Sequence, residues 1–431
     1  MEYGLTEHPG RWALVNEVHA RPYEELNTPE RGSHLALMSG EHAGEVEYEH
    51  LVRLCRHYGT PEPGPDTHHF MVDLGPVRVR WERHTEFCTY TFFRQGGFDD
   101  PFAHPVIDFL PRDWLAALPG TVLAAVHFAL EPREQGAARP PEALAALFNG
   151  NTLVGSRIAG GAGRMYSDLW LHDDGFARIL IQDEGFNARQ AGRHVQRLLE
   201  VHTYRLMALL ALDPARRAAP ELSRADAELN NIAAAMAESQ QDQTDARLLE
   251  RLSAVASDIE AVTAATSYRF GAARAYYNIV QRRLQELREE RIQGVQPLGE
   301  FLERRMAPAM QTCEEVGGRA RGLSDRGARM AALLRARVEV QLETQNQDQL
   351  AAMNRRAELQ LRLQETVEGL SVVAISYYVT GLIGYLLKGA KAGGLPFVQP
   401  DLFTGIAVPL VVAALWLGLK RAKRFLKEEE K

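Results

Sequence analysis

The pattern of hydrophobic and polar positions divides the chain into regions of different character. Up to about residue 184, short apolar, β-branched and aromatic runs alternate with turns that carry Pro and Gly. The runs VRVRW, FCTYTFF, TVLAAVHFAL and ARILIQDEG predict strands, whereas 113–118 and 141–148 predict short helices. We therefore expect an α/β or α+β domain over residues 1–185.

Two turn sequences lie within this first domain. The sequence HDDG at 172–175 separates MYSDLWL from FARILI, and an Asp-Gly turn between two such runs predicts a β-hairpin. The glycine-rich sequence GGAGR at 160–164 lacks the GxGxxG pattern and the GK(S/T) ending of phosphate-binding loops. We interpret it as a bend between strands.

Helical spacing replaces the strand pattern after residue 186, and strand signals disappear. Apolar side chains and one histidine recur at intervals of three and four positions. They are Val195, Leu198, Leu199, His202, Leu206 and Leu209. Asp213-Pro214 is predicted to end this helix, because proline cannot continue a helix interior.

Long helices are expected beyond this point. Runs rich in Ala, Leu, Glu, Arg and Gln begin near residue 221 and extend over 244–291. Gly294 and Pro297 mark a joint before the next helix. The pattern thus predicts a long helical region at 186–296 and a stalk helix at 297–368.

Two long apolar runs follow the stalk. Residues 369–387, GLSVVAISYYVTGLIGYLL, contain no charged side chain, and 402–419, LFTGIAVPLVVAALWLGL, form a second run. Each can cross a hydrocarbon core of ~30 Å at ~1.5 Å per residue. We expect two transmembrane helices joined by a short outside loop at 388–401; the alternative is a buried hairpin in a soluble core.

Charges that flank the two runs predict their orientation. Only Lys388 and Lys391 lie between the runs, whereas basic residues gather outside them. These are Arg355, Arg356 and Arg362 before the first run, and Lys420, Arg421, Lys423, Arg424 and Lys427 after the second. Basic loops stay in the cytoplasm, so both termini are expected there. The basic tail at 420–431 would bind anionic membrane lipid.

Composition narrows the function classes. The 431 residues are 45% hydrophobic and 24% charged, as in ordinary globular proteins. A net charge of -7 argues against a general nucleic-acid binder. The start, MEYGLTEHPGRWALVNEV, lacks the pattern of a signal peptide, and three scattered cysteines fit a reducing compartment.

A polar stripe runs through the first apolar run. Polar or small side chains recur every four residues at Ser376, Thr380 and Gly384, with Tyr377, Gly381 and Tyr385 beside them. Lipid disfavours polar side chains and turns them toward a partner or a lumen. The stripe therefore indicates close helix packing or the lining of a hydrated pore.

The stalk carries a comparable change along one seam. Along one face of the stalk helix, the apolar residues Leu334, Val338 and Leu342 are followed by the polar residues Gln345 and Gln349. A polar stretch within an apolar seam either faces water in an inner vestibule or fixes the register of an oligomer. The alternative is an ordinary solvated helix face.

The motif NEVHARP at 16–22 gathers several polar side chain types near the start. Its Asn16, Glu17, His19 and Arg21 precede Pro22. These residues could form a polar network or ligand pocket, but a cap with ion pairs that braces the first domain is the expected role. An enzyme that uses His19 and Glu17 is a more distant alternative.

Other candidate chemistry is sparse. The histidines at 50, 57, 68 and 69 with Cys55 form no CxxC pair or HExxH helix, so a structural role is expected and a metal site is the alternative. No GxSxG element or kinase motif set is present. We predict no enzyme and no cofactor.

Three long motifs carry a family resemblance. They are HPGRWALVNEVHARPYEEL, SRIAGGAGRMYSDLWLHDDGFARILI and RVEVQLETQNQDQLAAMNRRAELQLRLQETVEGLSVVAISYYVTGLIGYLLK. Together they resemble an uncharacterised bacterial family of predicted membrane-anchored proteins, over nearly the whole chain. This resemblance implies no particular reaction.

The order of the parts is also similar to the CorA-type divalent cation transporters. In both, the chain runs from a cytoplasmic α/β domain through long helices and a stalk that enters the first of two spans to a basic tail. The Gly-Met-Asn motif of that family is absent, because the matching region here is LIGYLLKGAKAGG. Lys388 and Lys391 at the outer mouth would repel cations and could favour anions.

The expected function follows from this topology and the polar stripe. We expect a CorA-like homo-oligomer, a pentamer, that conducts or transports an ion whose identity the sequence leaves open. The stripe would line or pack the pore. The alternative is a membrane-anchored scaffold or sensor whose cytoplasmic domain binds a partner or ligand.

Overall fold

The computed structural model describes residues 6–12, 14–15, 23–40, 43–65, 67–238, 242–392 and 400–429. The chain divides into two compact units. The first comprises Met1–Ser239 and Leu248–Ala331, and the second comprises Gln240–Arg247 and Ala332–Lys431. The NEVHARP residues Asn16, Glu17, His19, Arg21 and Pro22 lie outside the described residues.

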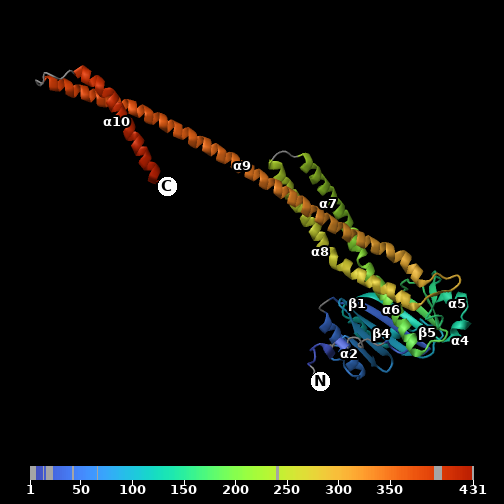
Figure 1. The fold of residues 1–431 in the computed structure, drawn as a ribbon. Helices are drawn as coiled ribbons and strands as arrows, with labels where there is room; N and C mark the ends of the chain where they lie inside the picture. The colour runs from blue at the N-terminus through green and yellow to red at the C-terminus, as the bar shows by residue number, and fades with distance from the viewer. Residues whose placement is uncertain are drawn as a thin grey trace. The chain divides into compact units, whose positions relative to one another are not determined.

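A mixed sheet of nine strands forms the centre of the first unit (Figure 1). Its order is β2-β3-β4-β1-β5-β8-β7-β6-β9. Only β5 and β8 pair in parallel, and every other neighbouring pair is antiparallel. The strands are β1 Glu30–Met38, β2 His69–Asp73, β3 Arg78–Arg83, β4 Phe87–Gln95, β5 Thr121–Glu131, β6 Val154–Ile158, β7 Gly163–Ser167, β8 Ala177–Asp183 and β9 Glu290–Arg291.

The four runs predicted as strands are all confirmed, and so are both turns. β7 and β8 pair antiparallel across the HDDG sequence, where the His172 amide donates to the Phe176 carbonyl at 2.9 Å. Gly175 has a φ of +80°, the left-handed conformation that the turn requires. The GGAGR sequence connects β6 to β7 as the predicted bend.

Short helices cover one face of the sheet, which we call the α2 face. Trp81, Tyr90 and Phe92 from the sheet pack there against α2 and α3 in a large apolar cluster. Farther along the sheet, Ala129 and Leu180 contact residues beside α5. The covering elements are α2 Gly44–Tyr58, η1 Val106–Phe109, α3 Arg112–Ala116, α4 Arg133–Ala138 and α5 Pro141–Ala146.

The opposite face, called the α6 face, is covered by α6, Ala188–Leu209. Asn187 and Gln190 form a capping box that fixes the start of this helix. Gly192 allows the chain at Glu24 to cross the helix closely, because a Cβ at position 192 would lie 1.6 Å from the Glu24 carbonyl oxygen. The first unit is therefore an α/β/α sandwich.

Three long helices complete the first unit (Figure 1). They are α7 Leu212–Glu238 and the parts of α8, Asp242–Leu287, and α9, Leu298–Ala392, that belong to this unit; α8 belongs to it from Leu248 onward. Arg251 of α8 pairs with Glu228 of α7, and Arg326 of α9 pairs with Asp226 of α7. Ion pairs thus connect all three helices.

Two predictions about these helices are wrong. Asp213-Pro214 lies in the first turn of α7 rather than at the end of α6, because proline is tolerated where the backbone N–H has no helical partner. The helix predicted to reach residue 291 ends at Leu287, since Arg288 turns left-handed at φ 48°. The next residues, Glu290–Arg291, form β9, a strand that the helical pattern does not predict.

The second unit contains the rest of α9 and α10, Pro400–Glu429. Both helices include an apolar window long enough to cross a membrane. Only 11% of the first window and 0% of the second are buried in the structure, unlike the core helix of a soluble protein.

Candidate functional site

The polar stripe predicted in the first apolar run faces α10. Ser376 is only 6% exposed, and a Cβ on Gly384 would lie 3.5 Å from Thr404 Oγ1 of α10. The Thr380 hydroxyl donates to the Ser376 carbonyl at 2.7 Å, within its own helix. Within one chain, Ser376 is buried and Gly384 lies close to Thr404, and both helix packing and pore lining stay predictions.

Residues beside the stripe border an open groove between α9 and α10. Tyr377 and Tyr385 are each 77% exposed and line this groove together with Gly381. Lys388 and Asp401 contribute the two charges of the groove. The predicted outer-mouth residue Lys391 lies in α9, but its side chain is outside what the structure describes.

The stalk positions lie in the exposed part of α9. Gln345 and Gln349 are exposed, as is every residue from 342 to 367. Large apolar side chains share this exposure, including Leu350, Met353 and Leu363. A run of exposed apolar positions of this length is typical of a surface that another helix covers. The inner-vestibule role of the two glutamines stays a prediction.

A second candidate site lies in the first unit, and no sequence motif predicts it. The α6 cavity is bounded by β1, β3 and β4 below and by α6 above. It encloses about 200 Å³, which is smaller than the about 300–1,000 Å³ of typical small-molecule sites, so it can hold only a small ligand. Its principal polar lining residues are His34, Arg80, Glu82, Thr89, Glu200 and Arg283.

His34 of β1 is a buried titratable group of the cavity floor. Its Nδ1 lies 2.8 Å from Thr91 Oγ1, and its Nε2 lies 3.0 Å from Thr203 Oγ1. Burial lowers the pKa of His34 to about 3, so the ring is neutral near pH 7. A neutral imidazole donates once and accepts once, so one of the two threonines keeps its own proton for another acceptor.

Arg80 of β3 lies beside this histidine, with only 4% of its surface exposed. Its Nη2 is 2.7 Å from Glu82 Oε1. Burial alone would raise the pKa of Glu82, but the Arg80 guanidinium outweighs it and holds that pKa below its usual range. Among the described residues, neither Arg80 Nε nor Thr89 Oγ1 has a hydrogen-bond partner. Two donors below the cavity are therefore unused.

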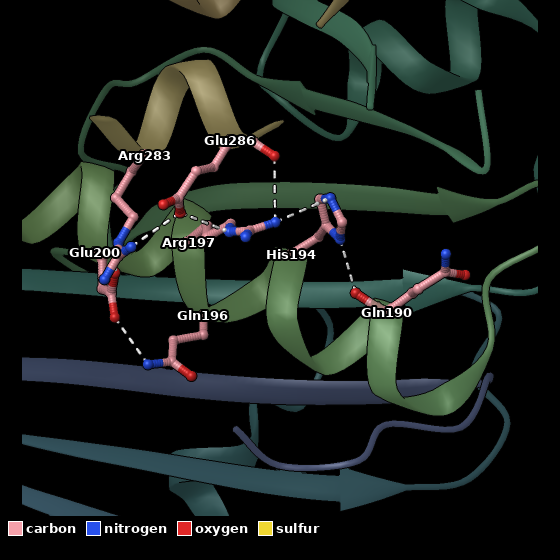
Figure 2. A network of polar contacts seen from close by, with 7 residues as sticks. All are labelled: Gln190, His194, Gln196, Arg197, Glu200, Arg283 and Glu286. Carbon is pink, nitrogen blue, oxygen red and sulfur yellow. Dashed lines mark hydrogen bonds and ion pairs between the residues drawn. The ribbon is translucent and has the colours of Figure 1, made fainter. Parts of the chain in front are cut away.

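Figure 2 shows the polar network beside the cavity, where α6 meets α8. Arg283 pairs with Glu200, and its Nη1 also lies 2.9 Å from Glu286 Oε2. Gln196 donates to Glu200 at 2.8 Å, and Arg197 donates to Glu286 at 3.0 Å. Glu200 is thus held from two sides, which fixes a carboxylate at the roof of the cavity.

His194 in the same figure belongs to the structural part of this network. Its Nδ1 lies 2.8 Å from the Gln190 carbonyl oxygen, which can only accept, so Nδ1 carries the proton. The Arg197 Nη1 lies 3.5 Å from the other ring nitrogen. Burial lowers the pKa of His194, in keeping with this neutral ring.

The segment that enters the described chain at Tyr23 closes one side of the cavity. Glu24 lines the cavity and pairs with Arg78 at 2.5 Å, and Arg78 also pairs with the buried Glu30. Burial raises the pKa of Glu30 to about 7 in spite of Arg78. The NEVHARP motif ends at Pro22, two positions before Glu24 in the sequence.

A hydrolase-like chain of side chains exists on the α2 face. Ser33 Oγ lies 2.9 Å from His127 Nδ1, and His127 Nε2 lies 3.6 Å from Asp174 Oδ2. Ser33 is 0% exposed, borders none of the cavities described above, and already accepts from the Ile107 amide at 3.2 Å. A nucleophile must reach its substrate, so we assign this chain a structural role.

The histidines near Cys55 do not gather into a ligand set. His50 is buried and stacks on Trp114 at 4.4 Å, whereas His57 is exposed on the same helix. Among the described residues, no group of three or more His, Cys, Asp or Glu side chains could hold a metal ion.

The fold and the two sites define a class: an α/β/α sheet domain and long helices in one chain with a two-helix apolar hairpin. A family model described as "Protein of unknown function (DUF3422)" matches residues 6–426. The chain therefore belongs to the DUF3422 family, which confirms the predicted membership of an uncharacterised family. No curated protein matches the sequence.

Proposed function

We propose that the protein is a CorA-like homo-oligomer of a bacterial inner membrane that conducts or transports an ion. The observation that supports this proposal most is the exposure of both apolar windows, of which 11% and 0% are buried. Such helices need lipid or further helices around them. A two-span subunit cannot enclose a path alone, so several subunits, a pentamer in this proposal, must surround it.

The exposed stretch of α9 at 342–367 supports self-assembly. Its apolar positions would pack between copies, while Gln345 and Gln349 would face an inner vestibule. The basic flanks of the two spans favour cytoplasmic termini, and the tail from Lys420 would bind anionic lipid. No catalytic residue and no nucleic acid take part in this proposal.

The ion path itself would lie along the polar stripe. Ser376, Thr380 and Gly384 would line it or pack the helices that surround it. Lys388 in the groove would repel cations, and Asp401, the other charge of the groove, would offset part of this effect.

Flux measurements test this function. The full-length protein in liposomes should release an entrapped ion under an imposed gradient, with anions such as chloride and cations such as magnesium assayed separately. Thr380→Trp should reduce the flux, because the large ring would fill the stripe. Leu386→Trp, at a position that is 73% exposed on the same helix and does not line the groove, is the matched control and should not. Absence of flux for every ion assayed would contradict the proposal.

A second function is favoured by a specific observation, the α6 cavity. The protein would then be a membrane-anchored scaffold or sensor, whose sheet domain binds a ligand or partner while the hairpin serves as a tether. In this case, deletion of residues 369–431 should leave ligand binding intact and should remove only membrane attachment.

A further inference from the structure

We infer that the α6 cavity binds a small zwitterion of the amino-acid class, with its carboxylate toward Arg80 and Thr89 and its ammonium toward Glu200. The inference specifies the ligand of the second candidate function. It is independent of ion conduction, because the cavity lies wholly within the first unit.

The carboxylate end follows from the unused donors of the cavity floor. Arg80 and Thr89 are each 4% exposed, and Arg80 Nε and Thr89 Oγ1 find no hydrogen-bond partner in the described chain. Buried polar groups without partners are uncommon in native proteins and call for an explanation. A third donor is the threonine hydroxyl that neutral His34 leaves free. Three donors, one of them on a guanidinium and two of them hydroxyls, suit the oxygens of a carboxylate.

The ammonium end follows from the charge balance of the walls. The charged residues that line the cavity are the carboxylates Glu24, Glu82 and Glu200 and the guanidiniums Arg80 and Arg283. A ligand that carries only negative charge would add to this surplus of carboxylates. A zwitterion adds no net charge to the cavity, and its ammonium group can donate to Glu200. The position of Glu200 is fixed by Arg283 and Gln196.

Apolar side chains line the part of the cavity that would hold the rest of such a ligand. Phe87 and Phe93 line the floor, and Leu199 and Tyr204 line the α6 wall. Pockets with a few convergent polar groups among aromatic and aliphatic side chains are typical of small-molecule sites. The ordinary alternative is a cavity filled by water alone.

Thr89→Val separates the two possibilities. Valine keeps the shape of threonine but removes the hydroxyl. If the cavity holds only water, loss of the unpartnered hydroxyl should leave the free energy of unfolding the same or higher. It should also leave the affinity for any amino acid unchanged. If the hydroxyl donates to a bound carboxylate, affinity for the ligand should fall about tenfold, whereas the melting temperature without ligand should not fall.

Tyr90→Phe is the matched control. Tyr90 is the next residue of β4 and points to the α2 face, where its hydroxyl is also buried and has no partner among the described residues. The two variants therefore delete the same kind of group from opposite faces of one strand. Tyr90→Phe should leave the affinity within about twofold of the wild type.

The experiment uses the full-length protein in lipid discs, with the twenty proteinogenic amino acids screened by thermal shift and the positive ones measured by calorimetry. Succinate and inorganic phosphate test the anion alone, and putrescine tests the amine alone. We expect at least one amino acid to bind at submillimolar concentration, more tightly than these three compounds, and to lose affinity in Thr89→Val only. Equal binding of succinate or phosphate, no amino-acid binding, or unchanged affinity in Thr89→Val would each overturn the inference.

Discussion

Alternate residues of the same strands point to opposite faces of the sheet, and the two faces have different roles. On the α2 face, Trp81 and Tyr90 join a closed apolar cluster with Trp114 of α3. On the α6 face, the neighbouring residues Arg80 and Thr89 border a cavity. Because side chains alternate along a strand, the same two strands can supply a rigid core and a polar site at once. Substitutions on the α2 face should therefore change mainly stability, whereas substitutions at the neighbouring residues on the α6 face should change mainly binding.

The largest expected effect concerns the closed face. Trp81→Ala removes a fully buried indole from the α2 cluster, so the free energy of unfolding should fall by about 3–5 kcal/mol. Trp170→Ala, at a position that is 67% exposed, is the control and should change it by less than about 0.5 kcal/mol. Chemical denaturation of both variants measures the difference. Equal losses in the two variants would show that the α2 face is not the stabilising core.

The next effect concerns the α6 face. Gly192→Ala places a Cβ within 1.6 Å of the Glu24 carbonyl oxygen, so the segment that closes the cavity must move. We expect a loss near the upper end of about 1–3 kcal/mol. Gly271→Ala in α8 meets no heavy atom within 4 Å and should instead gain up to about 1 kcal/mol, from helix propensity. If Gly192→Ala were as stable as Gly271→Ala, the close crossing at Glu24 would be refuted.

The free energy of unfolding should fall at acidic pH, because buried histidines on both faces of the sheet contribute. Burial lowers the pKa of His34 on the α6 face to about 3 and that of His127 on the α2 face to about 4. Each histidine stabilises the fold fully above pH 6.5, and that contribution is lost as the pH falls toward the lowered value. Glu30 acts in the opposite direction, because burial raises its pKa to about 7 and its contribution is lost as the pH rises.

Burial also lowers the pKa of His50, to about 4, and that of His202, so the buried histidines outnumber Glu30 and unfolding takes up protons at acidic pH. The free energy of unfolding should therefore fall by at least about 2 kcal/mol between pH 7.5 and pH 5. Chemical denaturation at the two pH values measures it. A transition midpoint that stays constant or rises at pH 5 would mean that the histidines are not held neutral.

The smallest expected effect extends the comparison to the hairpin. The Ser376 hydroxyl has no hydrogen-bond partner among the described residues, so Ser376→Ala should change stability by less than about 1 kcal/mol. Ion flux then distinguishes the two interpretations of the stripe. Unchanged flux indicates that the stripe packs helices, whereas altered conductance indicates that it lines the path.

Much of the fold was predictable from local patterns. The β-branched and aromatic runs predict the strands, and uninterrupted apolar composition predicts the two windows in α9 and α10. The strand β9 was not predictable, because two residues, Glu290–Arg291, carry no periodicity. Their pairing depends on Ser156 and Arg157, which lie more than a hundred positions away in the sequence.

The two candidate sites differ in the same respect. The polar stripe is visible in the sequence because Ser376 and Thr380 interrupt an otherwise apolar run. Arg80 and Thr89 alternate with apolar residues, which is the usual pattern of a strand with one solvent-exposed face. Only the packing of α6 over that face reveals that they are buried. The alternation itself was the available signal, but it could not distinguish water from a covering helix.

The native mass of the full-length protein in lipid discs is the most direct test of the proposed assembly. The proposed conduction requires several copies around one path, so the mass should correspond to a closed ring, a pentamer in our proposal. A stable monomer or dimer would contradict it. The two apolar helices would then serve as a tether for the sheet domain.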